Sequence, residues 1–146
     1  IEDYAFLGNT NLETITFGPD VEEIGLYAFQ NCVNLKKVEI NDAMGIVNAG
    51  AFKGCKSLKE IDFSNATLAT IGYESFADCT SLVKVETAET LSEIGDYAFE
   101  NTKLKTLKLY KNVNSITADA FAGVKTLFDL QHSDIMQALR ETREEN

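Results

Sequence analysis

The chain has 146 residues, of which 45% are hydrophobic and one is proline, so it has enough apolar material to build a core. Its formal net charge of −10 argues against a nucleic-acid partner, because phosphate binding needs clustered Lys and Arg side chains. There is no apolar run of about 18 residues and no basic start followed by an apolar stretch, so neither a membrane-inserted segment nor a signal peptide is predicted.

Taken in chain order, six dipeptides that end in Phe mark an internal repeat. They are Ala5-Phe6, Ala28-Phe29, Ala51-Phe52, Ser75-Phe76, Ala98-Phe99 and Ala120-Phe121, and the intervals between successive Phe residues are 23, 23, 24, 23 and 22 residues. An aliphatic residue precedes each Phe by five positions, and a Leu-x-x-aliphatic segment follows it. One register kept over nearly the whole chain predicts a solenoid, in which neighbouring repeats stack to bury a shared core.

The end of each Leu-x-x-aliphatic segment alternates with the period of a β-strand. The segments are residues 12–17, 35–40, 58–63, 82–87, 104–109 and 127–132. Stacked copies place these strands parallel, about 4.8 Å apart, in one continuous sheet. The return path of each repeat is expected to cover the opposite side with short turns or single helical turns. The extra residue of the 24-residue interval falls between Phe63 and Leu68, and the missing residue of the 22-residue interval falls between Phe99 and Leu104. Both places are corners, where a change in length does not shift the buried columns.

The Phe and Cys residues that recur in the repeat are interpreted as core residues. A Phe in every repeat, preceded by Ala or in one case Ser, is typical of a buried column and not of a ligand-stacking platform. Cys32, Cys55 and Cys79 each follow a repeat Phe by three residues, a spacing that fits no zinc motif, so we expect buried free thiols. His132, the one histidine, occupies an inward column and is expected at the edge of the core.

Both ends of the chain depart from the pattern. Residues 133–146 break the repeat and predict a C-terminal helix that begins after Ser133 and serves either as a cap or as the start of a following segment. At the other end, Ile1 occupies a position in the middle of a repeat. We therefore expect six repeats over residues 1–132, the first one incomplete, in a piece of a longer protein.

Two segments carry a family resemblance: Ile94-Gly95-Asp96-Tyr97-Ala98-Phe99 and Ala51-Phe52-Lys53-Gly54-Cys55-Lys56-Ser57-Leu58-Lys59-Glu60-Ile61. They resemble the BspA-like leucine-rich repeat family. The resemblance implies a curved, right-handed leucine-rich repeat solenoid with a parallel β-sheet on one face. It also implies an extracellular or cell-surface location in bacteria or protozoa, and some members of the family adhere to host matrix proteins such as fibronectin. Only Gly18-Pro19 keeps the Pro that often follows the strand in this family.

The outward positions of the strands supply the candidate partner-binding face, which consists of Lys37, Glu39, Glu60, Asp62, Lys84, Glu86 and Lys108. Lys37, Glu60 and Lys84 alternate in sign along one column and are expected to pair across strands. Glu39, Asp62 and Glu86 form an acidic column that would attract a basic patch on a partner or a cation. The alternative is a solvated surface on which the neighbouring lysines neutralise these carboxylates.

These observations favour a non-catalytic protein-binding module. A flat, open sheet offers no enclosed pocket that would raise the pKa of one carboxyl group, so paired carboxylates do not indicate a glycosidase. No catalytic residue, metal site or cofactor is predicted. A structural spacer that presents other domains of a larger surface protein is the second hypothesis, and an intracellular signalling adaptor is the third.

Overall fold

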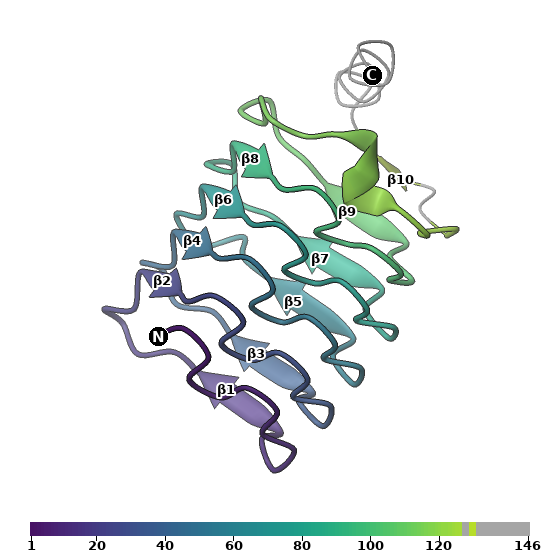
Figure 1. The fold of residues 1–146 in the computed structure, drawn as a ribbon. Coiled ribbons are helices and arrows are strands. Elements are labelled where there is room, and N and C mark those ends of the chain that lie inside the picture. The colour runs from purple at the N-terminus through teal and green to yellow at the C-terminus, as the bar shows by residue number, and fades with distance from the viewer. Residues whose placement is uncertain (127–128, 131–146) are drawn as a thin grey trace.

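The computed structural model describes residues 1–126 and 129–130, and within them the chain winds as a solenoid with two rows of parallel strands (Figure 1). We call one row the front row, a name that does not refer to the view in Figure 1. It consists of β1 (Thr14–Thr16), β3 (Lys37–Glu39), β5 (Glu60–Asp62), β7 (Lys84–Glu86), β9 (Thr106–Lys108) and β10 (Asp129–Leu130). The rear row consists of β2 (Glu23–Ile24), β4 (Ile46–Val47), β6 (Thr70–Ile71) and β8 (Glu93–Ile94). The predicted helix over residues 133–146, like His132, lies outside the described residues.

The front strands pair in the register that the repeat predicts. Glu60 lies opposite Lys84, and Lys84 lies opposite Thr106. The prediction of one continuous front sheet is wrong, however, because β1 and β3 form one sheet and β5, β7, β9 and β10 form another. The rear sheet runs without interruption past this break, since β4 pairs with both β2 and β6. The rear row therefore joins the two parts of the front row.

The rear sheet is a second difference from the sequence analysis, which expected turns or helical turns on that side. Each rear strand has two residues, an exposed or half-buried one followed by a buried aliphatic one. Helical turns are nearly absent: within the described residues the helical content is the 3-10 helix η1 (Ala118–Phe121). The rear side is thus built from two-residue strands, with tight turns between them and the next front strand.

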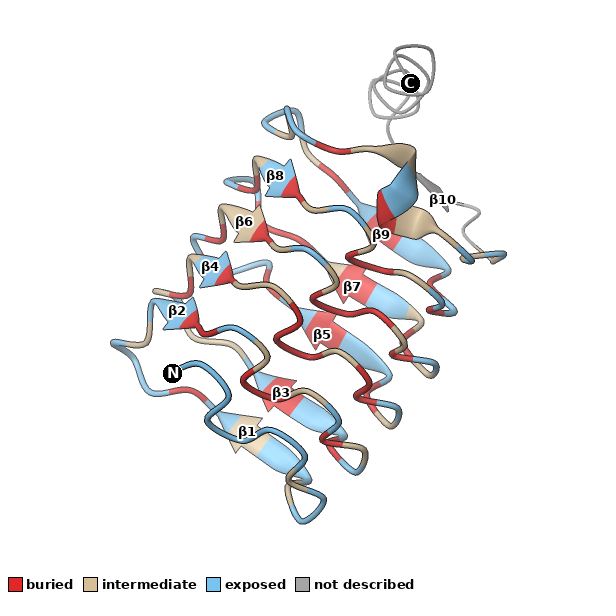
Figure 2. Cartoon of the chain, in the orientation of Figure 1, coloured by how far each residue is buried: buried red, intermediate tan, exposed pale blue. Residues whose placement is uncertain are grey.

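The core lies between the two rows of strands (Figure 2). Phe29, Phe52, Phe76 and Phe99 are buried, as predicted, whereas Phe6 in the first repeat is 38% exposed. The phenyl rings of successive repeats are stacked, with centroids 5.2 to 5.8 Å apart. Phe6 is exposed because the described structure has a repeat on only one side of it.

A turn in the left-handed region follows each repeat Phe by two residues. Its φ angles lie between 59° and 76°, and the residues are Gly8, Asn31, Gly54, Asp78, Asn101 and Gly123. Glycine adopts this conformation without steric cost, and Asn and Asp adopt it more readily than other residues do. The column of Gly, Asn and Asp in the sequence is therefore a backbone requirement.

The Cys column is buried and unpaired, as predicted. Each thiol donates a hydrogen bond to the carbonyl of the Phe in the preceding repeat: Cys32 to Phe6, Cys55 to Phe29 and Cys79 to Phe52, with distances of 3.0 to 3.2 Å. Burial raises the pKa of all three thiols. These thiols act as packing residues that also link neighbouring repeats.

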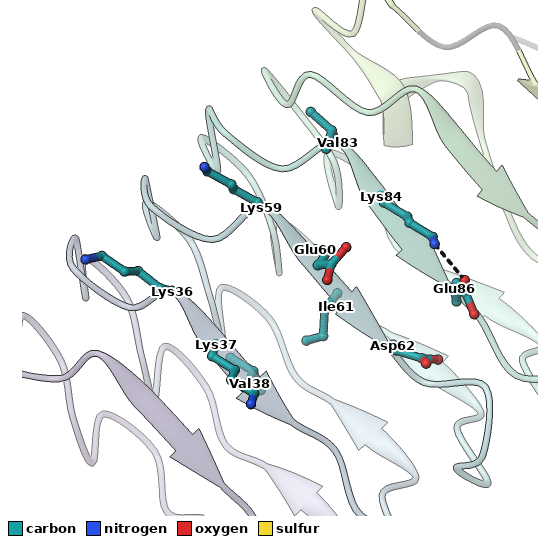
Figure 3. Close-up of a pocket in the computed structure, with 10 residues that line it drawn as sticks. All are labelled: Lys36, Lys37, Val38, Lys59, Glu60, Ile61, Asp62, Val83, Lys84 and Glu86. Carbon is teal, nitrogen blue, oxygen red and sulfur yellow. Dashed lines mark ion pairs between the residues drawn. The ribbon is translucent and has the colours of Figure 1, made fainter.

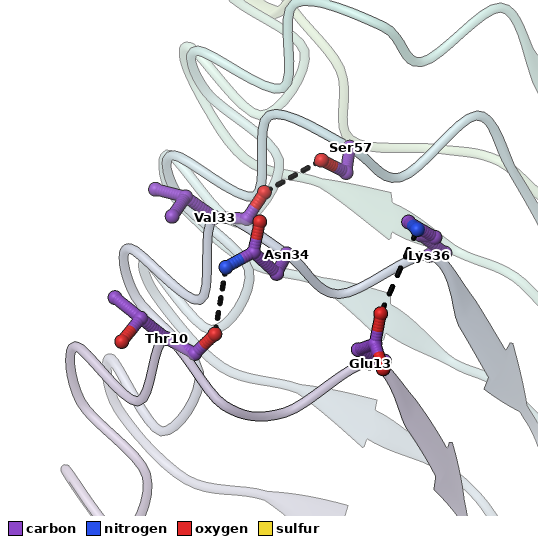
Figure 4. A network of polar contacts seen from close by, with 6 residues as sticks. All are labelled: Thr10, Glu13, Val33, Asn34, Lys36 and Ser57. Atoms are coloured by element: carbon purple, nitrogen blue, oxygen red, sulfur yellow. Dashed lines mark hydrogen bonds and ion pairs between the residues drawn. The ribbon is translucent and has the colours of Figure 1, made fainter.

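Polar side chains add further links between repeats on the connections that lead into the front strands (Figure 4). The Asn34 amide donates to the Thr10 carbonyl at 2.7 Å, and the Ser57 hydroxyl donates to the Val33 carbonyl at 2.6 Å. No backbone N–H of the described residues donates to either carbonyl, so each side-chain bond satisfies an acceptor on a connection. The connections therefore stack in register with the strands that follow them.

Candidate partner-binding face

The solvent side of the front row, which we call the front face, carries the predicted site residues. The middle residue of each three-residue strand points into the core, as Val38, Ile61 and Val85 do, so the flanking residues point outward. Lys37, Glu39, Glu60, Asp62, Lys84, Glu86 and Lys108 all lie on this face. Of these, Glu86 is half-buried and the others are exposed.

A depression of about 650 Å³ lies at the centre of the front face, over β3, β5 and β7 (Figure 3). It brings together Lys37, Glu60, Asp62, Lys84 and Glu86. Three further residues at its border were not predicted: Lys36, Lys59 and Val83. Each lies immediately before a front strand. Including the residue that precedes each strand in the candidate face would therefore have predicted them.

A second depression of about 400 Å³ adjoins the first, because Lys84 and Glu86 line both. It includes Lys108, whose Nζ atom lies 4.9 Å from the centre of the Tyr110 ring, a cation–π distance. Glu39 is in neither depression and lines a smaller one with Asp62. Six of the seven predicted residues therefore line two adjoining hollows of one face.

The charges on this face pair along the strands and not across them, which corrects the sequence prediction. The Nζ atom of Lys37 lies 3.0 Å from Oε1 of Glu39, and that of Lys84 lies 3.1 Å from Oε1 of Glu86. Residues two apart on a strand share a face, and the lysine side chain is long enough to reach its neighbour. The prediction that Lys37, Glu60 and Lys84 pair with one another is wrong.

Each of these ion pairs shifts the pKa of one member, Glu39 in the first pair and Lys84 in the second. The hydrogen bond from Lys37 lowers the pKa of Glu39, which also accepts a hydrogen bond from the Thr16 hydroxyl at 3.2 Å. The hydrogen bond to Glu86 raises the pKa of Lys84. Both shifts favour the charged form, the carboxylate of Glu39 and the ammonium of Lys84.

The central strand β5 carries the carboxylates that form no ion pair with the lysines of the front face. Within the described residues, the Glu60 carboxylate has neither an ion pair nor a side-chain hydrogen bond, although Lys84 lies opposite it in the sheet. Asp62 accepts one hydrogen bond, from the backbone N–H of Ser64 at 2.8 Å. The middle of the depression therefore presents carboxylates between lysines that are already paired.

Within the part of the chain that the structure describes, no three His, Cys, Asp or Glu side chains are grouped to hold a metal ion. The same residues include no helix with the length and apolar character needed to cross a membrane. What the face offers is an open, charged surface with two shallow hollows.

Comparison with known families agrees with this architecture. The model of the BspA type leucine-rich repeat region matches residues 1–128 as six copies. The chain belongs to the BspA-type leucine-rich repeat family. No curated protein matches it.

Two solved structures of leucine-rich repeat proteins resemble this BspA-type solenoid. A leucine-rich repeat protein from T. pallidum is 31% identical, with a TM-score of 0.83 over 87% of this chain and 59% of that one. A leucine-rich cell surface protein from Faecalibacterium prausnitzii is 27% identical, with a TM-score of 0.76 over 87% of this chain and 35% of that one. This chain therefore spans less than two thirds of either protein.

Proposed function

We propose that this chain is a non-catalytic protein-binding module of a secreted or cell-surface protein, and that its partner docks on the front face. The observation that carries the proposal is the central depression, where unpaired Glu60 and Asp62 stand among exposed charges on three successive strands. The F. prausnitzii protein, whose name places it at the cell surface, supports the location. By resemblance to its family, the partner is a host or matrix protein and the role is adhesion.

The proposed partner contributes basic side chains to this face. Lys37 and Lys84 already neutralise Glu39 and Glu86, which leaves the carboxylates of β5 to attract a cation. Such rim and surface charges mainly set the association rate and the salt dependence of binding. Binding should therefore weaken as ionic strength rises.

The test is charge reversal on the front face with a matched control. The triple variant Glu60→Lys, Asp62→Lys, Glu86→Lys, whose residues all line the central depression, is compared with Asp20→Lys, Asp42→Lys, Glu89→Lys, which changes the net charge equally at the corner where the chain leaves the front strands. Binding to immobilised fibronectin and laminin and to epithelial cells is measured by surface plasmon resonance and flow cytometry. We expect the front-face variant alone to lose binding, by about tenfold or more.

A structural spacer is the second candidate function, since a solenoid of stacked repeats is also a stiff rod. A spacer predicts that neither triple variant changes any binding and that the intact chain binds none of the probes. Circular dichroism and thermal melting show whether each variant is folded. Equal losses in both folded variants would contradict a docking site on the front face.

A further inference from the structure

The lysines of this acidic protein gather on the connections that lead into the front strands. These connections are residues 9–13, 32–36, 55–59, 79–83, 102–105 and 124–126, and their charged residues are Glu13, Lys36, Lys56, Lys59, Lys103, Lys105 and Lys125. All seven are exposed. Lys36 is paired with Glu13 at 3.6 Å. We call the remaining lysines, which are Lys56, Lys59, Lys103, Lys105 and Lys125, the basic edge.

The basic edge runs parallel to the axis of the solenoid. Lys59 and Lys105 directly precede β5 and β9, and Figure 3 shows Lys36, Lys59 and Val83 at equivalent places before three successive strands. The hydrogen bond from Ser57 to Val33 ties two of these connections together. A bond from the Thr126 hydroxyl to the Leu104 carbonyl, 3.0 Å long, does the same nearer the other end. The stacked backbone thus places the lysines along one border of the front face, with none on the connection of residues 79–83.

The opposite border of the front face has the opposite charge. There the chain leaves the front strands, through residues 17–22, 40–45, 63–69, 87–92 and 109–114. The charged residues of these segments are Asp20, Glu22, Asp42, Glu89 and Lys111. Charge is therefore separated across the width of the front face, and the resulting field attracts an anion to one border and repels it from the other.

The lysines of the basic edge are free of internal partners. Among the described residues, none of the five has an ion pair or a side-chain hydrogen bond, in contrast to Lys37, Lys53 and Lys84, each of which pairs with a Glu. An exposed, unpaired ammonium contributes little to folding stability. The basic edge is consequently available to an external anion.

We propose that the basic edge binds a linear acidic polysaccharide, which lies along the solenoid axis. Residues 55–59, 102–105 and 124–126 contain no aromatic side chain, so the stacking surface that single-stranded nucleic acid uses is missing. Lys56, Lys103, Lys105 and Lys125 line neither of the two depressions of the front face, so these hollows do not place the aromatic or Arg anchors of a protein partner against them. Flexible point charges in a row suit a polymer with repeated sulfate or carboxylate groups.

The acidic remainder of the molecule would orient such a polymer. With a net charge of −10, the surface outside the basic edge repels a polyanion, which restricts the contact to this border. The basic edge adjoins the protein-docking site on the front face, because Lys59 lies at the border of the central depression. The other four lysines of the basic edge line neither depression.

The experiment measures binding of the intact chain to immobilised heparin, a sulfated polysaccharide, across a series of salt concentrations. The variant Lys56→Gln, Lys105→Gln is compared with Lys111→Gln, Asn114→Asp, which lowers the net charge equally at exposed positions on the opposite border. We expect the basic-edge variant to lose about tenfold in affinity at low salt and to depend less steeply on salt, and the control variant to lose roughly twofold or less.

Three results would overturn the proposal: no retention of the wild type on heparin, equal losses in the two variants, or equally tight binding of poly-glutamate or single-stranded DNA. Circular dichroism of each variant excludes unfolding as the cause of a loss. Heparin binding is measured without any protein ligand. Its failure therefore leaves the front-face proposal standing, and the reverse also holds.

Discussion

The Nζ atom of Lys53 lies 2.5 Å from Oε2 of Glu74, and this is the one ion pair among the described residues in which both side chains are largely shielded, with 26% and 15% exposed. Glu74 has a φ of 53°, a left-handed conformation that is unfavourable for a side chain of its size. The pair joins the third repeat to the fourth on the side of the repeat Phe residues. The hydrogen bond to Glu74 raises the pKa of Lys53.

Lys53→Met should lower the free energy of unfolding by about 1 to 3 kcal/mol, because the shielded Glu74 carboxylate loses its partner. Urea unfolding followed by circular dichroism gives the value. Adding Glu74→Gln to Lys53→Met should recover part of the loss. Lys36→Met is the matched control, since Lys36 and Glu13 are each 66% exposed, and it should change stability by less than about 0.5 kcal/mol. Equal losses in both single variants would contradict this account.

The same ion pair should make stability depend on alkaline pH. The pKa of Lys53 is higher in the folded protein than in the unfolded chain, so the contribution of the pair is complete below the unfolded value, about 10.4, and disappears as the pH rises through the folded value. The difference in unfolding free energy between the wild type and Lys53→Met should therefore be constant from pH 7 to 9 and shrink above about pH 10.5. A difference that grows with alkaline pH would refute this direction.

The phenylalanine column provides a test of packing. Phe52 is fully buried between the rings of Phe29 and Phe76, so Phe52→Ala should cost about 3 to 5 kcal/mol. Phe6 is 38% exposed and stacks on one ring, so Phe6→Ala should cost roughly half of that or less. Both values come from denaturant unfolding. A loss below about 1 kcal/mol for Phe52→Ala would be incompatible with the repeat register.

The sequence alone predicts the buried columns because they recur. Phe29, Phe52 and Leu58 each occupy a position that is apolar in every repeat, and period and chemistry together place them in the core. The rear strands carry no comparable signal, since two residues such as Glu23–Ile24 are too few to reveal alternation. The left-handed column is visible in the sequence as Gly, Asn and Asp, but only the backbone geometry explains it.

The candidate site is less predictable than the core. The repeat identifies which residues point outward, but it does not tell whether Lys37 pairs with Glu39 on its own strand or with Glu60 on the next. That choice depends on side-chain reach and on competing partners. The break in the front sheet has no sequence signal either, because β3 and β5 have the same pattern of outward charge around a buried aliphatic residue.

The break between β3 and β5 should be visible in amide hydrogen exchange. The backbone N–H groups of Val83 and Lys84 donate to the Lys59 carbonyl at 2.9 and 3.4 Å, whereas those of Lys59 and Glu60 make no equivalent bond to β3 in the described structure. We expect the amides of Lys59 and Glu60 to exchange faster than those of Val83 and Lys84. Equal protection of both pairs, measured by NMR, would show that the front sheet is continuous.

The Cys column should be inert toward thiol reagents in the folded protein. Only the thiolate reacts, and burial, the largest effect, raises the pKa of Cys79 to about 12 and also raises that of Cys55. At pH 8 the native protein should therefore react with Ellman's reagent far more slowly than the urea-unfolded protein, in which all three thiols are accessible.

Two substitutions calibrate the measurement of thiol reactivity. Thr102→Cys adds a thiol at the equivalent buried position of the fifth repeat and should also react slowly, whereas Thr80→Cys adds an exposed one and should react at once. If one native thiol reacted as fast as that of Thr80→Cys, the column would hold a reactive cysteine, and its role would go beyond packing and the hydrogen bonds between repeats.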